Sequence, residues 1–224
     1  MRRCILLSGG MDSTVLLWKT VYIDNVKDIL LLSFDYGSAH AEKELSKAKT
    51  IFSLAQEAFP EVKLEHRIIP LDFSSWGMKS GLLASQKDIP EGHYEEKSME
   101  KTVVPFRNGI MLSIAAGLLK EGILLYGGHA GDHAIYPDCR KEFVSAMSQA
   151  ISRGTNNWIT LEAPFASRSK REIAQLGGAL RVPFEETWSC YNGREKHCGK
   201  CGTCVERKEA LEGFDPTEYE EEEV

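Results

Sequence analysis

The feature that most constrains this chain lies near its start, where the short apolar run Cys4–Leu7, with the pattern of a buried strand, ends in a serine and two glycines. The stretch reads Leu7-Ser8-Gly9-Gly10-Met11-Asp12-Ser13-Thr14, with hydroxyls and an acid at the start of an expected helix. Glycines let the backbone approach an anion, and the amides and positive dipole end of a helix start stabilise that anion. The pattern therefore predicts a strand–loop–helix unit that holds phosphates.

The loop differs from the better-known Gly-x-x-x-x-Gly-Lys-Ser/Thr loop because no lysine follows its glycines. Ser8, Ser13 and Thr14 offer hydroxyl donors in its place. The alternative is a glycine-rich turn without a ligand, which explains the three hydroxyls and the acid less well. We expect Leu7–Thr14 to contact a nucleotide, with Ser8, Asp12 and Ser13 as catalytic candidates.

The charge balance narrows the class of partner. The chain has 224 residues and a net charge of −6, much of it carried by the acids at 218–223. Broad nucleic-acid surfaces depend on Lys and Arg, so we expect a small charged substrate and no stable nucleic acid. No apolar run approaches the ~20 residues of a membrane span or the ~7–15 of a secretory signal. We therefore expect a cytoplasmic protein without membrane contact.

Strand and helix patterns alternate along the chain. The expected strands are 4–7, 29–34, 64–69 and 123–126, and the expected helices are 13–21, 42–59, 109–120, 142–152 and 170–180. This alternation predicts an α/β fold, a Rossmann-like doubly wound parallel sheet with helices on both faces. Ligands of such sheets bind outside the carboxyl ends of the strands, where the strand order switches.

We expect one domain over residues 1–213 and a disordered acidic tail over 214–224. Residues 72–101 are polar and lack strong periodicity, which is typical of a lid, a binding loop or a disordered insertion.

Four cysteines close the domain with the spacing C-x7-C-x2-C-x2-C; they are Cys190, Cys198, Cys201 and Cys204. Four thiolates make a closed tetrahedral zinc site with no position left for catalysis, so we expect structural Zn²⁺ in a small C-terminal knuckle, residues 188–206. An iron–sulfur cluster and free thiols are the alternatives. In a reducing compartment, metal binding is favoured over disulfides.

Polar residues also stand near three other expected element ends. Arg107, just before the expected helix 109–120, can hold a phosphate or carboxylate in a fork, or can simply cap that helix. Lys170 can supply a mobile cation to phosphates, or can be an ordinary helix-start lysine. After the expected strand 123–126 come the candidate substrate contacts Asp132, Tyr136, Asp138 and Arg140. A planar, hydrogen-bonding ligand fits them better than a second metal ion.

The combination of these segments resembles the 7-cyano-7-deazaguanine synthase family, within the PP-loop ATP pyrophosphatases. The resemblance is carried by Ser8–Ser13, Phe34–Gly37, Val104–Asn108, His129–His133, Tyr136–Arg140, Ser169-Lys170 and Thr187–Gly193 with the four cysteines. After Phe34–Gly37 this chain has Ser38-Ala39-His40, where the family usually has Gln-Arg-His.

The resemblance implies an adenine nucleotide α hydrolase-like fold and an ATP-dependent C–N ligase. In that family, ATP activates the carboxylate of 7-carboxy-7-deazaguanine, ammonia converts it to the amide, and a second ATP drives formation of the nitrile (preQ0) in queuosine- and archaeosine-type biosynthesis. Mg²⁺ with the ATP, release of AMP and pyrophosphate, free ammonia and a homodimer are implied as well.

Three other functions remain open from the sequence. A related PP-loop enzyme could stop at the amide or modify a protein. A tRNA sulfurtransferase-like enzyme would use Cys139, the one cysteine outside the cluster that is expected near the pocket. A nucleotide- or RNA-binding module could use the knuckle, although acidic charge and the lack of interleaved aromatic and basic residues oppose it.

Overall fold

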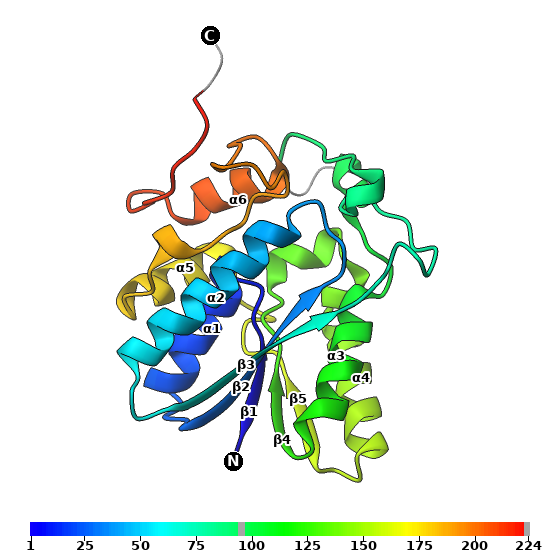
Figure 1. The fold of residues 1–224 in the computed structure, drawn as a ribbon, viewed down its shortest axis with the longest axis vertical. Coiled ribbons are helices and arrows are strands. Elements are labelled where there is room, and N and C mark those ends of the chain that lie inside the picture. Colours follow the sequence, from blue (N-terminus) through cyan, green and yellow to red (C-terminus); the bar gives the residue numbers. More distant parts are fainter. Residues whose placement is uncertain (94–96, 222–224) are drawn as a thin grey trace.

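Five parallel strands form the centre of the chain in a computed structural model that describes residues 1–93 and 97–221 (Figure 1). The strands are β1 (Arg3–Leu6), β2 (Asp28–Asp35), β3 (Lys63–Pro70), β4 (Gly122–Leu125) and β5 (Ile159–Glu162). Their order, β3-β2-β1-β4-β5, confirms the doubly wound α/β class. The chain moves outward from β1 to β3 and then returns beside β1 as β4, so the strand order switches between β1 and β4.

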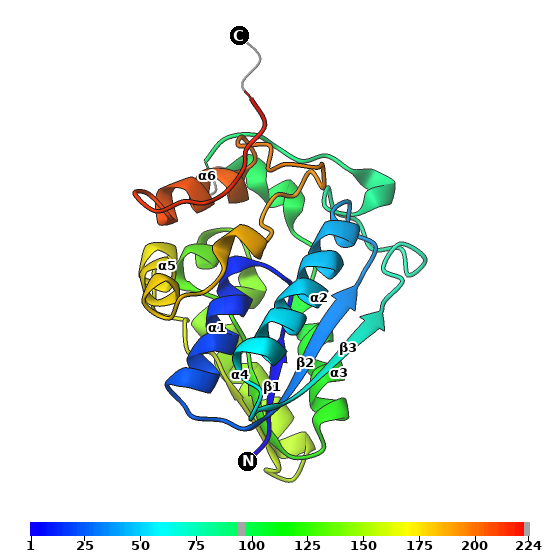
Figure 2. The ribbon, with the colours of Figure 1, turned by 60° about the vertical axis from the view of Figure 1, so that its left-hand side comes forward.

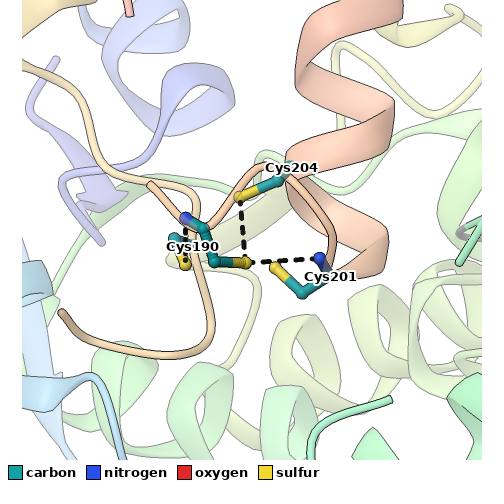
Figure 3. A group of neighbouring side chains, drawn as sticks. Cys190, Cys201 and Cys204 are labelled. Carbon is teal, nitrogen blue, oxygen red and sulfur yellow. Dashed lines mark hydrogen bonds between the residues drawn. The ribbon is translucent and has the colours of Figure 1, made fainter. Parts of the chain in front are cut away.

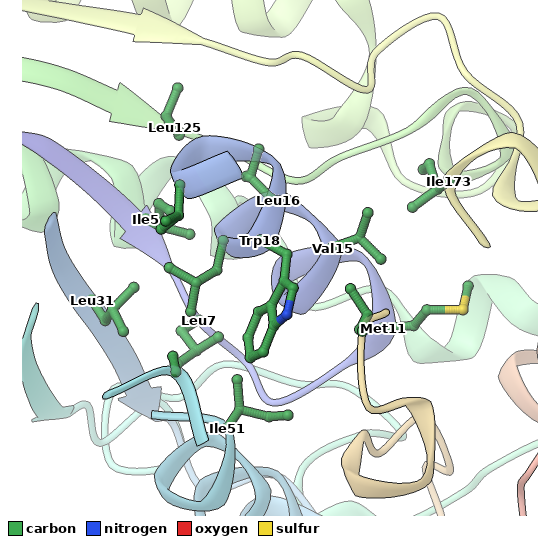
Figure 4. Packing of buried hydrophobic residues seen from close by; sticks show 14 of the residues in the cluster. Ile5, Leu7, Met11, Val15, Leu16, Trp18, Leu31, Ile51, Leu125 and Ile173 are labelled. Atoms are coloured by element: carbon green, nitrogen blue, oxygen red, sulfur yellow. The ribbon is translucent and has the colours of Figure 1, made fainter. Parts of the chain in front are cut away.

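Helices cover both faces of the sheet because the central strands are apolar on both sides. α1 (Met11–Tyr22), α2 (Ala41–Ala58) and α5 (Lys170–Ala179) cover one face, and α3 (Arg107–Leu119) and α4 (Lys141–Gly154) cover the other (Figures 1 and 2). Ile5 and Leu31 pack with α1 and α2, as Figure 4 shows, whereas Cys4 and Leu30 pack with α3.

Two elements have no counterpart among the predicted ones. β5 is an edge strand of four residues whose Thr160 and Glu162 are exposed, so its apolar signal is short. Helix α6 (Gly202–Ala210) is polar and begins directly after Cys201. α3 begins at Arg107, two residues earlier than predicted, so Arg107 lies in its first turn rather than before it.

The polar segment 72–101 is packed against the domain in the part that the structure describes. Phe73, Leu82 and Leu83 are buried in a cluster with Tyr36. An isolated bridge between Glu91 and Cys201 joins the segment to the knuckle. Of the three interpretations, the described part fits an ordered loop, because Phe73, Leu82 and Leu83 are buried against Tyr36, a residue of the pocket lining, although Trp76 is exposed.

Residues 214–221 lie along the knuckle. Tyr219 forms an isolated bridge with His197, and its hydroxyl donates to Asp215 Oδ2 at 2.7 Å. The last residues of the expected tail, 222–224, lie outside the described residues, so its disorder stays a prediction, as does the extent of the domain. Across the described parts of the chain, no helix combines the length and apolarity needed to cross a membrane.

The glycine loop approaches α2 too closely for a side chain at Gly9. Gly9 has φ +77°, and a Cβ there would lie 2.6 Å from both the Ala48 amide nitrogen and the Glu44 carbonyl oxygen. Gly37 has a similar φ of +75° but open space around it. A substitution at Gly37 therefore adds backbone strain alone, whereas the same substitution at Gly9 adds both strain and a steric clash.

We predict that Gly9→Ala lowers the free energy of unfolding by at least about 2 kcal/mol, because strain and clash add. Gly37→Ala is the matched control and should cost only about 1–2 kcal/mol for the left-handed backbone. Urea unfolding of both variants measures the difference. Equal losses would contradict the close approach of the loop to α2.

Candidate active site

A pocket of about 230 Å³ opens at the carboxyl ends of β1, β2 and β4, where the strand order switches. Seven segments of the chain line it. The glycine loop contributes Leu7, Ser8, Gly10, Met11, Asp12 and Ser13, and the other lining residues include Tyr36, Arg107, Tyr126, Asp132, Tyr136, Lys170 and Tyr191. The structure therefore brings together most residues that the sequence predicted for one crevice.

Hydroxyl groups hold the glycine loop in shape. Ser13 Oγ donates to the Gly10 carbonyl at 3.1 Å and accepts from the Ser8 amide at 3.2 Å. Thr14 Oγ1 also donates to the Gly10 carbonyl, at 2.8 Å, and Thr14 does not line the pocket. The N-cap of α1 is Gly10, which has no side chain to occupy the first amides of the helix. Those amides remain a binding site for an anion.

Lys170, the first residue of α5, lies in an ion cluster beside the loop. Its Nζ atom is 2.6 Å from Asp12 Oδ2, 3.2 Å from His129 Nε2 and 3.4 Å from Glu206 Oε2. Burial alone would lower the pKa of the lysine, but the carboxylates of Asp12 and Glu206 outweigh it and raise the pKa above its ordinary value. Lys170 is therefore a fixed positive charge at the pocket wall.

Glu206, beside the pocket, is a residue that sequence reasoning missed, as it missed Tyr191 in the pocket lining. Glu206 lies on the unpredicted helix α6, and its acidic type and position two residues after Cys204 give no signal of a contact with Lys170. Only the folded chain brings these two residues together.

Arg107 lines the same pocket as the glycine loop. Its Nη1 atom donates to the Tyr36 hydroxyl at 3.2 Å, and its guanidinium lies 5.6 Å from the centre of the Tyr36 ring. Burial alone would lower the pKa of the guanidinium, but Tyr36, Tyr191 and Asp138 raise it on balance. Its hydrogen bond goes to a neutral hydroxyl, so its charge is available to an anionic ligand.

The segment after β4 divides into residues that line the pocket and residues that support it. Asp132 and Tyr136 line the pocket, and the Tyr136 hydroxyl lies 3.2 Å from that of Tyr191. Asp138 instead accepts from the Asn108 amide at 2.8 Å, at the start of α3. Arg140 donates to the His133 carbonyl at 3.0 Å and lies outside the lining. A substrate role for Asp138 and Arg140 stays a prediction that this geometry does not support.

Cys139 is buried at the pocket wall, beside the Tyr126 hydroxyl at 3.0 Å and the Asn108 side-chain amide at 3.4 Å. Burial, with Asp132 as the next cause, raises the pKa of the Cys139 thiol well above its ordinary value. A thiol that stays protonated at neutral pH is a poor nucleophile. The geometry therefore disfavours sulfur transfer through Cys139.

The four cysteines of the knuckle converge on one point (Figure 3). All four sulfurs lie within 4.8 Å of one another, and Cys198 Sγ is 3.9 Å from Cys204 Sγ. Tetrahedral zinc with bonds of about 2.3 Å would place sulfurs about 3.8 Å apart. The Cys201 amide donates to Cys198 Sγ at 3.3 Å, and the Asn192 and Cys198 amides donate to Cys190 Sγ at 3.4 Å, as thiolates require. The residues fit zinc, and residues 1–93 and 97–221 contain no second group of this kind.

A short segment, residues 187–189 (the strap), joins the knuckle to the glycine loop. The Trp188 amide donates to the Gly9 carbonyl at 2.9 Å. Arg207 of α6, which is fully buried, holds the strap through Thr187 Oγ1 at 2.8 Å and Ser189 Oγ at 3.1 Å. The knuckle thus supports the glycine-loop side of the pocket through the strap, and its Trp188, Ser189, Tyr191 and Thr203 line the pocket.

The sheet order, the glycine loop at the switch point and the cysteine cluster define an α/β protein of the adenine nucleotide α hydrolase-like class. The chain belongs to the family described as "Queuosine biosynthesis protein QueC", whose family model matches residues 2–215.

Curated relatives agree with this family. A 7-cyano-7-deazaguanine synthase from Porphyromonas gingivalis is 50% identical over 222 residues, which cover 96% of each chain. One from Desulfotalea psychrophila is 46% identical over 221 residues, covering 96% of this chain and 97% of the relative. A solved structure, the U34-tRNA thiolase NcsA from Methanococcus maripaludis with its 4Fe-4S cluster, has a TM-score of 0.49 and 13% identity, over 85% of this chain and 61% of that chain. A likeness this weak carries no information about the reaction.

We predict that removing the metal with a strong chelator unfolds the knuckle, because structural zinc contributes on the order of 10–16 kcal/mol to such segments. Elemental analysis should find zinc in the untreated chain, and hydrogen exchange should show lost protection over 188–206. Cys198→Ser should lose metal, whereas Cys4→Ala, outside the cluster, should retain it. A metal-free chain of full stability would contradict this interpretation.

The raised pKa of Cys139 gives a second prediction. The thiolate forms only as the pH rises through the raised pKa, so iodoacetamide should label Cys139 slowly at pH 8 compared with free glutathione. Mass spectrometry of the labelled peptide measures the rate. Cys139→Ala should keep ATP-dependent activity; rapid, selective labelling with loss of activity would instead favour sulfur transfer.

Proposed function

We propose that this chain is an ATP-dependent ligase that converts 7-carboxy-7-deazaguanine and ammonia to 7-cyano-7-deazaguanine in queuosine-type biosynthesis. The family and its curated relatives support this reaction. The observation that carries it is a single pocket that both an uncapped helix start and the charged Arg107 line. A phosphate and a carboxylate can therefore meet in one place.

The proposed reaction has two activation steps, and each needs a pocket that binds both ATP and the substrate. A carboxylate is a poor electrophile and an amide oxygen a poor leaving group until each is bonded to phosphorus. We propose that the acid is adenylated with release of pyrophosphate, that ammonia displaces AMP to form the amide, and that a second activation lets the amide oxygen leave as the nitrile forms. Positioning and charge stabilisation, rather than covalent catalysis, are then the work of the protein.

The glycine loop and Lys170 are proposed to hold the phosphates. Ser8–Ser13 would supply amides and hydroxyls, and Lys170 would stabilise the charge on the departing diphosphate. The Oδ1 atom of Asp12 is buried and, among the described residues, lacks a hydrogen-bond partner, which fits a role in holding Mg²⁺. Mg²⁺, when bound with ATP, would shield phosphate charge.

Arg107 is proposed to bind the substrate carboxylate, and Asp132, Tyr136 and Tyr191 to surround the deazaguanine ring. An acid such as Asp132 can accept from ring N–H or amino groups, and tyrosine rings can stack on a planar base. Zinc is proposed to be structural, because its four ligands leave no open position. A homodimer, which the family likeness supports, and a cytoplasmic location, which the lack of a signal-like or membrane-spanning apolar run supports, complete the proposal.

The direct test incubates the chain with ATP, Mg²⁺, ammonium and the carboxy-deazaguanine, and follows acid, amide and nitrile by mass spectrometry. We expect the nitrile to accumulate after a transient amide, with AMP and pyrophosphate as nucleotide products. Amide as the final product would assign the chain to a related enzyme. ADP and phosphate alone would contradict adenylation at the loop.

We also predict that Arg107→Gln raises the KM for the carboxylate substrate about 10–100-fold, because a hydrogen bond to a charged group contributes roughly 1.5–3 kcal/mol. Arg171→Gln, which changes an exposed arginine paired with Glu212, is the matched control. Steady-state kinetics with varied acid measures both. An unchanged KM in Arg107→Gln would exclude Arg107 from the carboxylate site.

A further inference from the structure

Helix α6 brings a carboxylate from the knuckle to the ion cluster. The helix begins directly after Cys201 and carries Cys204 in its first turn, so the cysteine cluster fixes where it starts. Glu206 follows on the same helix. Its Oε2 atom lies 3.4 Å from Lys170 Nζ, and its Oε1 atom lies 3.9 Å from His129 Nε2.

Three side-chain atoms lie around the Lys170 ammonium group: two carboxylate oxygens and an imidazole nitrogen of His129, whose Nδ1 atom accepts from the Gly131 amide. They are Asp12 Oδ2 at 2.6 Å, His129 Nε2 at 3.2 Å and Glu206 Oε2 at 3.4 Å. Lys170 and Asp12 line the pocket, whereas Glu206 stands behind Lys170, outside the lining. Its carboxylate is only 12% exposed, and a charge so buried costs free energy unless it is paired.

From this geometry we propose that Glu206 is a positioning residue, which holds the Lys170 ammonium where it meets the phosphates of a bound nucleotide and does not touch the nucleotide itself. The inference rests on the proposed function, because Lys170 must have phosphates to act on. It assigns the knuckle a second task beyond stability, namely to orient a cation in the pocket.

Two effects of removing the Glu206 charge have opposite signs. Coulomb repulsion alone predicts that nucleotide binds more tightly once a negative charge near its phosphates is gone. Positioning predicts weaker binding, because the released ammonium is no longer held at its binding position. A displacement of about 1 Å can cost up to about 10²-fold.

The experiment measures the dissociation constant of an ATP analogue with a methylene bridge between its α and β phosphates, with Mg²⁺, by calorimetry. We expect Glu206→Gln to raise this constant about 10-fold. In a Lys170→Met background the same substitution should no longer weaken binding, since the carboxylate then has no lysine to orient, and only the Coulomb effect, which tightens binding, should remain. General damage to the fold would not produce that dependence. Glu209→Gln, on the same helix with a carboxylate 58% exposed, is the matched control and should bind normally.

Unchanged or tighter binding by Glu206→Gln, or equal weakening in both lysine backgrounds, overturns the proposal. Metal content and thermal unfolding are checked for each variant. If Glu206→Gln does not fold, Glu206→Asp, which keeps the charge but withdraws it from Lys170, takes its place with a smaller expected loss. If the unsubstituted chain does not bind the analogue, the proposed phosphate site is wrong, and the role of Glu206 is wrong with it. This result is distinguishable from the outcomes above, in which the unsubstituted chain binds and only the variants differ.

Discussion

The glycine loop depends on the backbone contact between Gly9 and α2. The missing Cβ lets the loop lie against Ala48 and Glu44, and this fixes where the next residues can go. Gly10 then begins α1 with its first amides exposed to the pocket, and the Gly9 carbonyl is left to accept from Trp188. One side chain at Gly9 would disturb the helix start and the strap together.

Charge is distributed unequally around the pocket. On the loop side, Asp12, Asp132 and Glu206 surround Lys170, so the carboxylates outnumber the lysine. Arg107, by contrast, donates to the neutral Tyr36 hydroxyl, and the nearby Asp138 carboxylate helps to raise its pKa. A triphosphate can approach the loop side only with added positive charge, which is consistent with a proposed Mg²⁺, whereas a carboxylate is attracted directly to Arg107. The loop side and Arg107 therefore suit the two different anions that the proposed reaction joins.

The sequence predicted the fold well where patterns are local. The buried strands, the glycine loop and the cysteine spacing each depend on residues close together in the chain, so their signal is strong. β5 was missed because four residues at a sheet edge carry little pattern. Likewise α6 was missed because its polar sequence gains its order from two cysteines rather than from an apolar face.

The sequence predicted which residues lie near the pocket better than it predicted what each residue contacts there. Asp138 and Arg140 have the residue types of ligand contacts, yet their hydrogen bonds go to Asn108 and His133 within the protein. Glu206 has no sequence signal at all, because its partner Lys170 lies on another helix. Whether a polar side chain binds a ligand or another part of the protein depends on which way the side chain points in the fold. Residue type and spacing do not encode that direction.

The strap has a consequence for how the molecule is made. During synthesis the glycine loop is made long before the Trp188 amide that bonds to it, and Lys170 follows its partner Asp12 by 158 residues. The pocket of a nascent chain therefore stays incomplete until these later residues have been added. A product that terminates before the cysteine-bearing helix α6 would have the sheet but lack the carboxylate that pairs with Lys170.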